Sequence, residues 1–255
     1  MEFIQDKTNV QESANETVNL SLFSVGAILN ITCKVLLKNP IVFFGLTLLS
    51  GALEEVAEYS LRLMIPGVGE RTFKLLQFFV GTLFRQWVGG AIAYGVYQSL
   101  KGNGASLGAS LFCGMRRLVP LVCVSFLYSV GVFLGSILLV VPGLILICIW
   151  DVAIPACVVE RLGPVDSLFR SEALTKGCRM KIFGLILILM IILQVVIRTA
   201  PLLIHDVRPR MYYILLELFD SIPTALINIM PAVIYFELRR VKEGVAVQNL
   251  ANVFD

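Results

Sequence analysis

The sequence predicts an all-α membrane protein with six transmembrane helices, and its composition and hydropathy pattern are the observations that predict it. Of the 255 residues, 57% are hydrophobic and only 15% are charged, and the mean hydropathy is +0.84. Soluble domains average about 45–50% apolar and about 25% charged residues, so much of this surface must face lipid. The apolar runs are long and show no two-residue alternation, which indicates helices rather than the strands of a barrel.

The residue inventory excludes several classes of protein. The net charge is only +3 and the basic residues are spread over the loops, which fits membrane orientation better than nucleic-acid binding. The six cysteines lie in or beside apolar runs without a CxxC pair, so we expect packing roles for them. One histidine, His205, leaves little for metal or triad chemistry. The sequence contains no phosphate loop, zinc spacing, nucleophile elbow or dinucleotide fingerprint, so we expect no enzyme activity, cofactor or metal.

The N-terminal segment, residues 1–21, is polar and acidic, with Lys7 as its only basic residue. Because no basic region precedes a short apolar core, the segment does not fit a signal peptide, and we expect a disordered tail. Residues 22–38 place apolar side chains near one stripe and predict a helix lying along the membrane surface. Asn39 and Pro40 end this helix, since the residue before a proline avoids helical geometry.

The first two predicted spans, residues 40–65 and 74–100, are joined by a turn that contains two glycines. The second span holds Arg85 near its middle, together with glycines that allow close contact between helices. The second half of the first span carries three glutamates and one arginine: Glu54, Glu55, Glu58 and Arg62.

The third and fourth predicted spans, residues 118–141 and 143–159, form a hairpin with a tight turn at Pro142. A short amphipathic segment, residues 105–117, precedes this hairpin. The third span carries no charge, whereas the fourth contains Asp151. At about 1.5 Å per residue the fourth span covers roughly 25 Å, slightly less than a hydrocarbon core of about 30 Å.

The fifth and sixth predicted spans, residues 182–204 and 211–238, follow a third amphipathic segment at residues 165–176. Pro223 and Pro231 interrupt the sixth span, and we expect a kink or break just before Pro223 because proline removes a helical hydrogen bond. The predicted transmembrane domain covers residues 22–244, and a short polar helix is predicted over residues 245–255.

The distribution of basic residues predicts the orientation of the chain. With the N-terminus inside, fourteen lysines and arginines fall in inner segments and six in outer ones. Because inner loops carry the excess of basic residues, both termini are predicted to be cytoplasmic, with the three amphipathic segments on the same side.

Three of the predicted spans end alike at this inner side. Each ends in a polar or charged cluster followed by a glycine, at Gly102, Gly163 and Gly244. One interpretation is a threefold repeat, each unit comprising an amphipathic helix and a transmembrane hairpin. The other is that any inward-ending helix tends to finish with polar residues and glycine, and the uneven spacing of 61 and then 81 residues favours it.

Charged side chains within the predicted spans form a candidate site. Each costs roughly 2.5–3.5 kcal/mol on insertion, so each needs a partner or a wet cavity. Counted from the turn between the first two spans, Glu54 and Glu55 lie at nearly the same depth as Arg85, which predicts a buried ion pair. The cluster either lines a substrate or proton path or only fixes helix packing. Its members are Glu54, Glu55, Glu58, Arg85 and Asp151.

A second candidate site is a set of basic side chains at the inner surface, where anionic lipid head groups attract them. Such a set also follows from the topology alone, so it is not specific evidence for lipid recognition. Its members are Arg116, Arg117, Arg170, Lys176, Arg179 and Lys181.

Several short motifs lie mainly in the second half of the chain, at residues 141–143, 153–156, 159–160, 171, 174–177 and 235–244. Through these motifs the chain resembles the YciC-like inner-membrane proteins and the membrane domain attached to some glycerophosphoryl diester phosphodiesterases. The resemblance implies a six-helix bacterial inner-membrane protein of poorly defined role. Phosphodiesterase activity is not expected, because the sequence has no room for the catalytic barrel and only one histidine.

Three functions remain open from the sequence. The favoured one is a non-enzymatic membrane protein of envelope or lipid homeostasis, in contact with the bilayer and with anionic lipids. A small-solute or ion transporter is the first alternative, and it requires a water-reachable cavity that touches Arg85 or Asp151. The second alternative is a membrane anchor for a partner enzyme. Oligomeric state and partner proteins are left undetermined.

Overall fold

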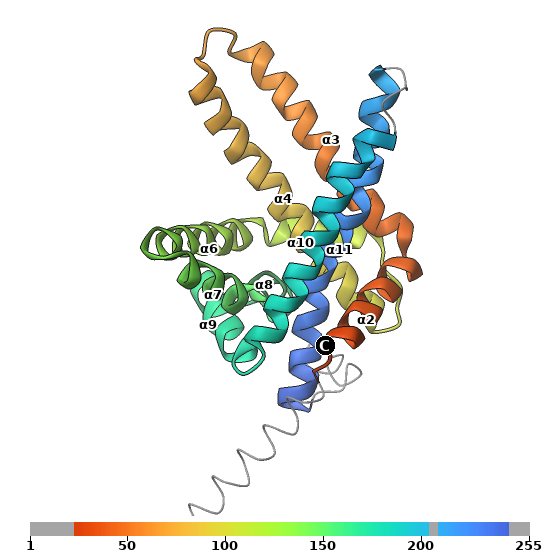
Figure 1. The fold of residues 1–255 in the computed structure, drawn as a ribbon, viewed down its shortest axis with the longest axis vertical. Helices are drawn as coiled ribbons and strands as arrows, with labels where there is room; N and C mark the ends of the chain where they lie inside the picture. The colour runs from red at the N-terminus through yellow and green to blue at the C-terminus, as the bar shows by residue number, and fades with distance from the viewer. Residues whose placement is uncertain (1–22, 204–208, 245–255) are drawn as a thin grey trace, which may run out of the picture.

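The computed structural model describes residues 23–203 and 209–244, and the secondary structure within these ranges is helical, without strands (Figure 1). The predicted N-terminal tail, the predicted C-terminal helix and His205 lie outside the described residues. The element order is three hairpins, each preceded by a short helix. The threefold repeat of these units stays a prediction.

The first hairpin consists of α3 (Pro40–Met64) and α4 (Glu70–Leu100), and α2 (Val25–Lys38) precedes it. Pro40 is the first residue of α3, where its missing N–H is not needed. The side-chain amide Nδ2 of Asn39 donates a hydrogen bond to the Ser99 hydroxyl at 3.0 Å. This bond ties the α2–α3 junction to the end of α4.

The second hairpin consists of α6 (Leu118–Leu138) and α7 (Val140–Trp150), flanked by α5 (Leu107–Arg116) and α8 (Ala153–Val159). The turn is the single residue Leu139, so the turn predicted at Pro142 is misplaced. Pro142 instead lies in the first turn of α7, where no N–H is required.

The helix is interrupted between α7 and α8, at Asp151 and Val152. Pro155 is a physical reason for the interruption, because it has no N–H to donate to the carbonyl of Asp151. The nearby carbonyl of Ile149 accepts hydrogen bonds from Ser171 Oγ at 2.7 Å and Thr175 Oγ1 at 3.2 Å. Two side chains of the short helix Pro164–Thr175 therefore provide hydrogen-bond donors to a backbone carbonyl beside the interruption.

The third hairpin consists of α10 (Arg179–Leu203) and α11 (Pro209–Glu243), and α9 (Pro164–Thr175) precedes it. The helix α11 continues through Pro223 and Pro231, so a break before Pro223 is absent, while a kink there stays a prediction. The C-terminal half of α11 forms the centre of the core, where it packs on α2, α3, α4, α8, α9 and α10. Fully buried side chains in this half include Ile229, Val233, Ile234, Tyr235 and Leu238.

Within residues 23–203 and 209–244, five helical segments are long and apolar enough to cross a membrane: Pro40–Met64, Leu118–Ile137, Val141–Val159, Arg179–Thr199 and Ser221–Glu243. The predicted span that is not among them is α4. Although it has 31 residues, it carries Arg85, three glutamines and several glycines, which make it less apolar.

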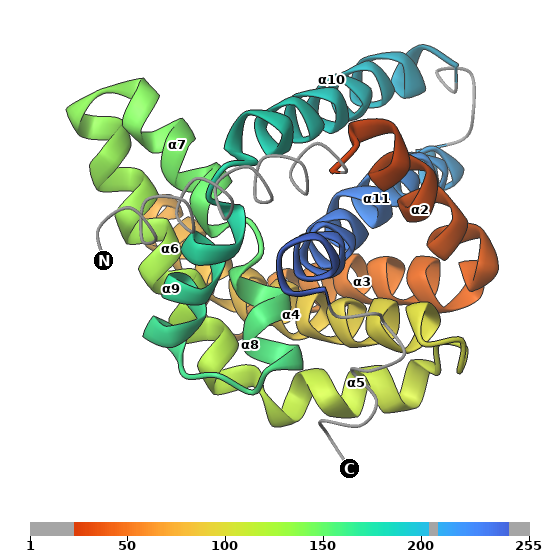
Figure 2. The same cartoon turned by 90° about the horizontal axis from the view of Figure 1, so that it is seen from below.

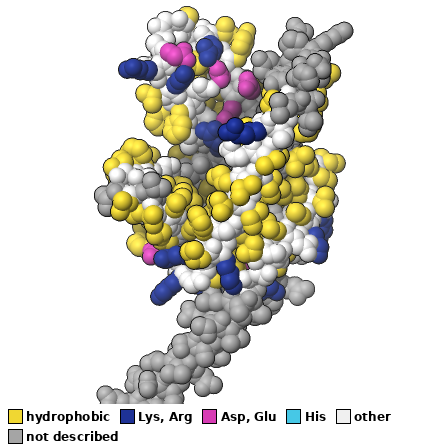
Figure 3. All heavy atoms as spheres, viewed as in Figure 1, with side chains coloured by type: hydrophobic (Ala, Val, Ile, Leu, Met, Phe, Trp, Pro, Cys, Tyr) yellow, Lys and Arg dark blue, Asp and Glu magenta, His cyan; other side chains and the backbone are white. Residues whose placement is uncertain are grey.

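The hairpins leave the core in different directions. Figure 1 shows the α3–α4 hairpin projecting upward and the α6–α7 hairpin projecting to the left, while Figure 2 shows α11 near the centre. Hydrophobic side chains cover much of the visible face, and basic side chains gather at its lower edge (Figure 3). Charged side chains of both signs also lie toward the tip of the α3–α4 hairpin.

Gly114 fixes α5 against α4. A Cβ atom at this position would lie 2.6 Å from the Trp87 carbonyl oxygen and 2.9 Å from the Ala91 nitrogen, both of which are backbone atoms of α4. The Trp87 indole N–H also donates to the Leu111 carbonyl at 2.9 Å. This close contact determines where the C-terminal end of α5 lies.

Gly114→Ala is therefore expected to destabilise the protein by about 1 to 3 kcal/mol, because α5 must move away from α4. Thermal unfolding in detergent measures this change. Gly108→Ala is the matched control on the same helix, since no atom lies within 4 Å of the added Cβ. It should leave stability unchanged or raise it by up to about 1 kcal/mol. Equal behaviour of the two variants would contradict the close contact.

Candidate functional site

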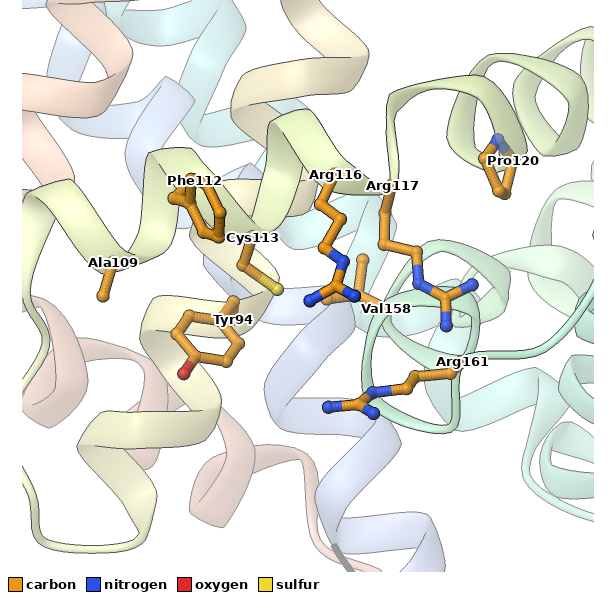
Figure 4. A pocket seen from close by; sticks show the side chains of 9 residues that line it. All are labelled: Tyr94, Ala109, Phe112, Cys113, Arg116, Arg117, Pro120, Val158 and Arg161. Carbon is orange, nitrogen blue, oxygen red and sulfur yellow. The ribbon is translucent and has the colours of Figure 1, made fainter.

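A pocket of about 420 Å³ lies between α4, α5, the start of α6 and the loop that joins α8 to α9 (Figure 4). Its size is within the usual range of small-molecule sites, about 300–1,000 Å³. We call it the three-arginine pocket. It is lined by Tyr94, Ala109, Phe112, Cys113, Arg116, Arg117, Pro120, Val158 and Arg161.

The three arginines enter the pocket from two sides. Arg116 ends α5, Arg117 is the residue between α5 and α6, and Arg161 belongs to the α8–α9 loop. Figure 4 shows their guanidinium groups gathered around the same space. Among the described residues the lining contains no carboxylate, and none of the three guanidinium groups makes a hydrogen bond or ion pair with another described residue. Three converging positive charges without a counter-charge favour the binding of an anion.

Arg161 has an unusual backbone conformation. Its φ is 55°, and it is the one non-glycine residue with a positive φ among the described residues. The left-handed region is unfavourable for side chains with a Cβ atom, and such residues concentrate at functional sites. A glycine would adopt this conformation without cost, so the arginine at this position suggests a role for its side chain.

The residue before Arg161 is held by an ionic network. Arg170 Nε of α9 donates to both oxygens of Glu160 at 2.9 Å, and the Tyr235 hydroxyl of α11 donates to Glu160 Oε1 at 2.6 Å. The network also includes Arg239 and Glu243, which pair at 2.8 Å, and Arg170 bonds to Glu243. We call these five side chains the Glu160 network. It fixes the start of the α8–α9 loop to α9 and α11.

The network changes the protonation equilibrium of Arg170. Burial acts to lower the pKa of its guanidinium, but hydrogen bonds and charges from Glu160 and Glu243 outweigh burial and hold the pKa above its ordinary value. Arg170 therefore remains a cation, and its positive charge is paired with Glu160 and Glu243.

Two other lining residues limit what the pocket can do. The Tyr94 hydroxyl accepts a hydrogen bond from Gln98 at 2.7 Å, which leaves its own proton available to a further acceptor. Burial raises the pKa of the Cys113 thiol, although Arg117, Arg161 and Arg116 act to lower it. Cys113 is therefore a neutral thiol at pH 7 rather than a nucleophilic thiolate.

The basic residues predicted to contact head groups differ in their surroundings, and their contact with head groups stays a prediction. The pocket contains Arg116 and Arg117, whereas Arg170 is part of the Glu160 network. Arg179 lies 3.8 Å from Glu172, and Lys181 donates to the Phe23 carbonyl at 2.8 Å. Lys176 is exposed.

Sequence reasoning did not single out Arg161. It was counted only as one of the inner basic residues. The available signal was its place in the charged cluster before Gly163, one of the three similar span ends.

The predicted contact between Glu54 and Arg85 is present, with Arg85 Nη1 3.0 Å from Glu54 Oε2. The pair is not buried within the protein, however, since the two side chains are 30% and 52% exposed. Glu58 pairs with Arg62 at 3.0 Å and accepts a hydrogen bond from Gln77. The α3–α4 hairpin thus carries its own polar contacts along the surface between its two helices.

The predicted five-residue cluster is divided in the structure. A pocket of about 110 Å³ between α3 and α4 is lined by residues that include Glu54, Glu55 and Glu58, but neither Arg85 nor Asp151 lines it. Asp151 lies separately at the interruption between α7 and α8. Its Oδ2 atom is buried and makes no hydrogen bond within the described part of the chain.

Arg85→Ala is expected to destabilise the protein, because Glu54 then loses its partner on the neighbouring helix. A polar contact between membrane helices contributes about 1 kcal/mol. Glu54→Gln in the same chain should recover most of this loss, and a double-mutant cycle on thermal unfolding measures the coupling. If the two changes simply add, the ion pair does not stabilise the hairpin.

All six cysteines are free thiols. No group of three or more His, Cys, Asp and Glu side chains within residues 23–203 and 209–244 is arranged to hold a metal ion.

No protein family, characterised protein or solved structure matches this chain. The resemblance to YciC-like proteins therefore stays a prediction based on its short motifs.

Proposed function

We propose that this protein is a non-enzymatic integral membrane protein of envelope or lipid homeostasis, which binds the head group of an anionic lipid. The observation that carries the proposal is the three-arginine pocket, where three guanidinium groups converge without a carboxylate. Guanidinium groups bind phosphate oxygens through paired, charge-assisted hydrogen bonds. In the proposed topology of six spans, the pocket lies at the cytoplasmic surface of a bacterial inner membrane, with both termini on that side.

The surface beside the pocket suits the acyl chains of such a lipid. Pro120, which lines the pocket, belongs to the first turn of α6. Exposed apolar side chains continue along one face of α6 away from the pocket: Val119, Phe126, Val130, Phe133 and Ile137. A head group at the arginines therefore places its chains along a helix that is apolar enough to face lipid.

Lipid retention tests the proposal. The purified protein is placed in mixed micelles with equal amounts of phosphatidylglycerol and phosphatidylcholine, and bound lipid is counted by native mass spectrometry. We expect preferential retention of phosphatidylglycerol, and its loss in the triple variant R116Q/R117Q/R161Q.

The matched control is K34Q/K38Q/K176Q, which removes three exposed positive charges elsewhere in the chain. It should retain the preference. Loss of the preference in both triple variants would show that net charge, rather than the pocket, attracts the lipid, and the proposal would fail.

A small-solute or ion transporter is a second candidate, favoured by one observation. Transport sites are often formed where a transmembrane helix is interrupted at mid-membrane, and Asp151 lies with a buried, unbonded oxygen at such an interruption. Asp151→Asn should then abolish proton- or ion-coupled uptake into vesicles without changing lipid retention. Unchanged uptake would remove this candidate. The anchor role stays a prediction.

A further inference from the structure

We infer that the ligand of the three-arginine pocket is a terminal phosphomonoester, a phosphate with one ester bond and three free oxygens. The inference rests on the proposed function, since it specifies which anion the pocket binds. The same group occurs on a lipid such as phosphatidic acid and on a small soluble phosphate ester.

The charge of the pocket favours this group over other anions. Arg116, Arg117 and Arg161 contribute three positive charges, and the lining supplies no negative one. A phosphodiester head group carries a single negative charge and leaves two positive charges uncompensated. A phosphomonoester carries about −1.5 to −2 charges at pH 7, so it compensates most of the charge of the site.

The arrangement of donors also favours a phosphomonoester. Two guanidinium groups come from the junction of α5 and α6, and the third comes from the α8–α9 loop across the pocket (Figure 4). A planar carboxylate accepts paired hydrogen bonds only in its own plane. The three free oxygens of a phosphomonoester point in three directions, so each can accept from a different guanidinium group. A phosphodiester has only two such oxygens.

The protonation of the ligand provides a signature of this chemistry. The second proton of a phosphomonoester dissociates near pH ~6, whereas a phosphodiester does not titrate in this range. The part of the chain that the structure describes places no histidine or carboxylate in the pocket: α4 contributes Tyr94, α5 contributes Cys113, and α6 and α8 contribute uncharged residues. Burial raises the pKa of Cys113 away from this range. A change in affinity around pH ~6 therefore reports the ligand rather than the pocket.

The experiment compares phosphatidic acid with phosphatidylglycerol in nanodiscs that contain the full chain. Occupancy of the pocket is read from alkylation of Cys113 by a small maleimide, located by peptide mass spectrometry, as the ratio of the rates with and without lipid for the same variant at the same pH, with the exposed Cys33 as internal control. We expect phosphatidic acid to protect Cys113 at a concentration about tenfold lower than phosphatidylglycerol at pH ~7.5, and this advantage to shrink at pH ~5. Both effects should vanish in R116Q/R117Q/R161Q.

The outcomes separate this inference from the proposed function. If both lipids protect Cys113 equally at pH ~7.5 and the triple variant loses protection, the pocket binds anionic lipid but the phosphomonoester inference is wrong. If glycerol 3-phosphate protects Cys113 and neither lipid does, the phosphomonoester inference holds with a soluble source and the proposed function fails. If neither lipid nor glycerol 3-phosphate protects Cys113, both proposals fail. Inorganic phosphate, which has no ester bond, is tested in a separate arm, and protection equal to that by glycerol 3-phosphate would show that the pocket does not select the ester and would overturn the inference.

Discussion

Arg161→Gly is expected to make the protein more stable and, at the same time, a weaker binder of anionic lipid. Glycine adopts the φ of 55° observed at this position without a Cβ clash, which removes a cost of about 1 to 2 kcal/mol. The same change removes one of three guanidinium groups. A charge-assisted hydrogen bond contributes about 1.5–3 kcal/mol, so the affinity for the anion should fall about tenfold to hundredfold. Thermal unfolding and lipid retention measure the two effects.

Two further variants separate backbone from side chain. Arg161→Ala removes the guanidinium but keeps a Cβ atom, so it should lose affinity without gaining stability. Arg161→Lys keeps a positive charge but not the planar pair of donors, so its affinity should lie between those of the unchanged protein and Arg161→Ala. If Arg161→Gly loses stability and keeps full affinity, the arginine has a structural role and does not contribute to the pocket.

Glu160→Gln should have the largest effect on stability of the changes considered. Glu160 accepts hydrogen bonds from Arg170 and Tyr235 and lies 3.7 Å from Arg239, and its side chain is only 16% exposed. Removing one partner of a buried ion pair costs about 3–5 kcal/mol, and the remaining exposure of the network reduces this to about 2–3 kcal/mol. The melting temperature should fall by about 5 to 10 °C. Anion binding should weaken several-fold, because Glu160 no longer fixes the start of the α8–α9 loop, which carries Arg161.

Glu237→Gln is the matched control for this change. Like Glu160→Gln, it removes one negative charge. Glu237 lies in α11 between Tyr235 and Arg239, the two α11 residues of the network that contact Glu160, and it pairs with Arg240 at 2.7 Å. Arg240 is 53% exposed, so the pair should contribute less than about 1 kcal/mol and the pocket should be unaffected. Tyr235→Phe removes a single hydroxyl and should cost about 1 kcal/mol. If Glu160→Gln and Glu237→Gln have equal effects, the Glu160 network does not hold the loop.

The hairpins and short helices could be predicted because their signals are local. Proline and glycine mark their ends, and apolar periodicity within each segment identifies helix. The contact of Glu54 with Arg85 could also be predicted, because a tight turn fixes the relative depth of residues on both helices of a hairpin. The exposure of this pair could not be predicted, since counting residues from the turn does not show which neighbouring helices cover the two side chains.

The three-arginine pocket could not be predicted because it depends on packing between distant segments. Arg116 and Arg161 are 45 positions apart, and they converge because Gly114 holds α5 on α4 while Glu160 ties the next loop to α11. Neither contact leaves a periodic or spaced pattern in the sequence. The polar side chains of α4 are visible in the sequence, but the hairpin pattern of the first two spans predicts a membrane span there.

The single-residue turn at Leu139 bears on how the chain enters its membrane. The tip of the α6–α7 hairpin, residues 137–141, is a run of isoleucine, leucines and valines. No hydrophilic loop has to cross the hydrocarbon when this hairpin inserts. Insertion therefore does not require the free energy of moving charged groups into the hydrocarbon. Because a hairpin leaves the bilayer on the side from which it enters, its depth of insertion does not alter the sidedness of the segments before and after it.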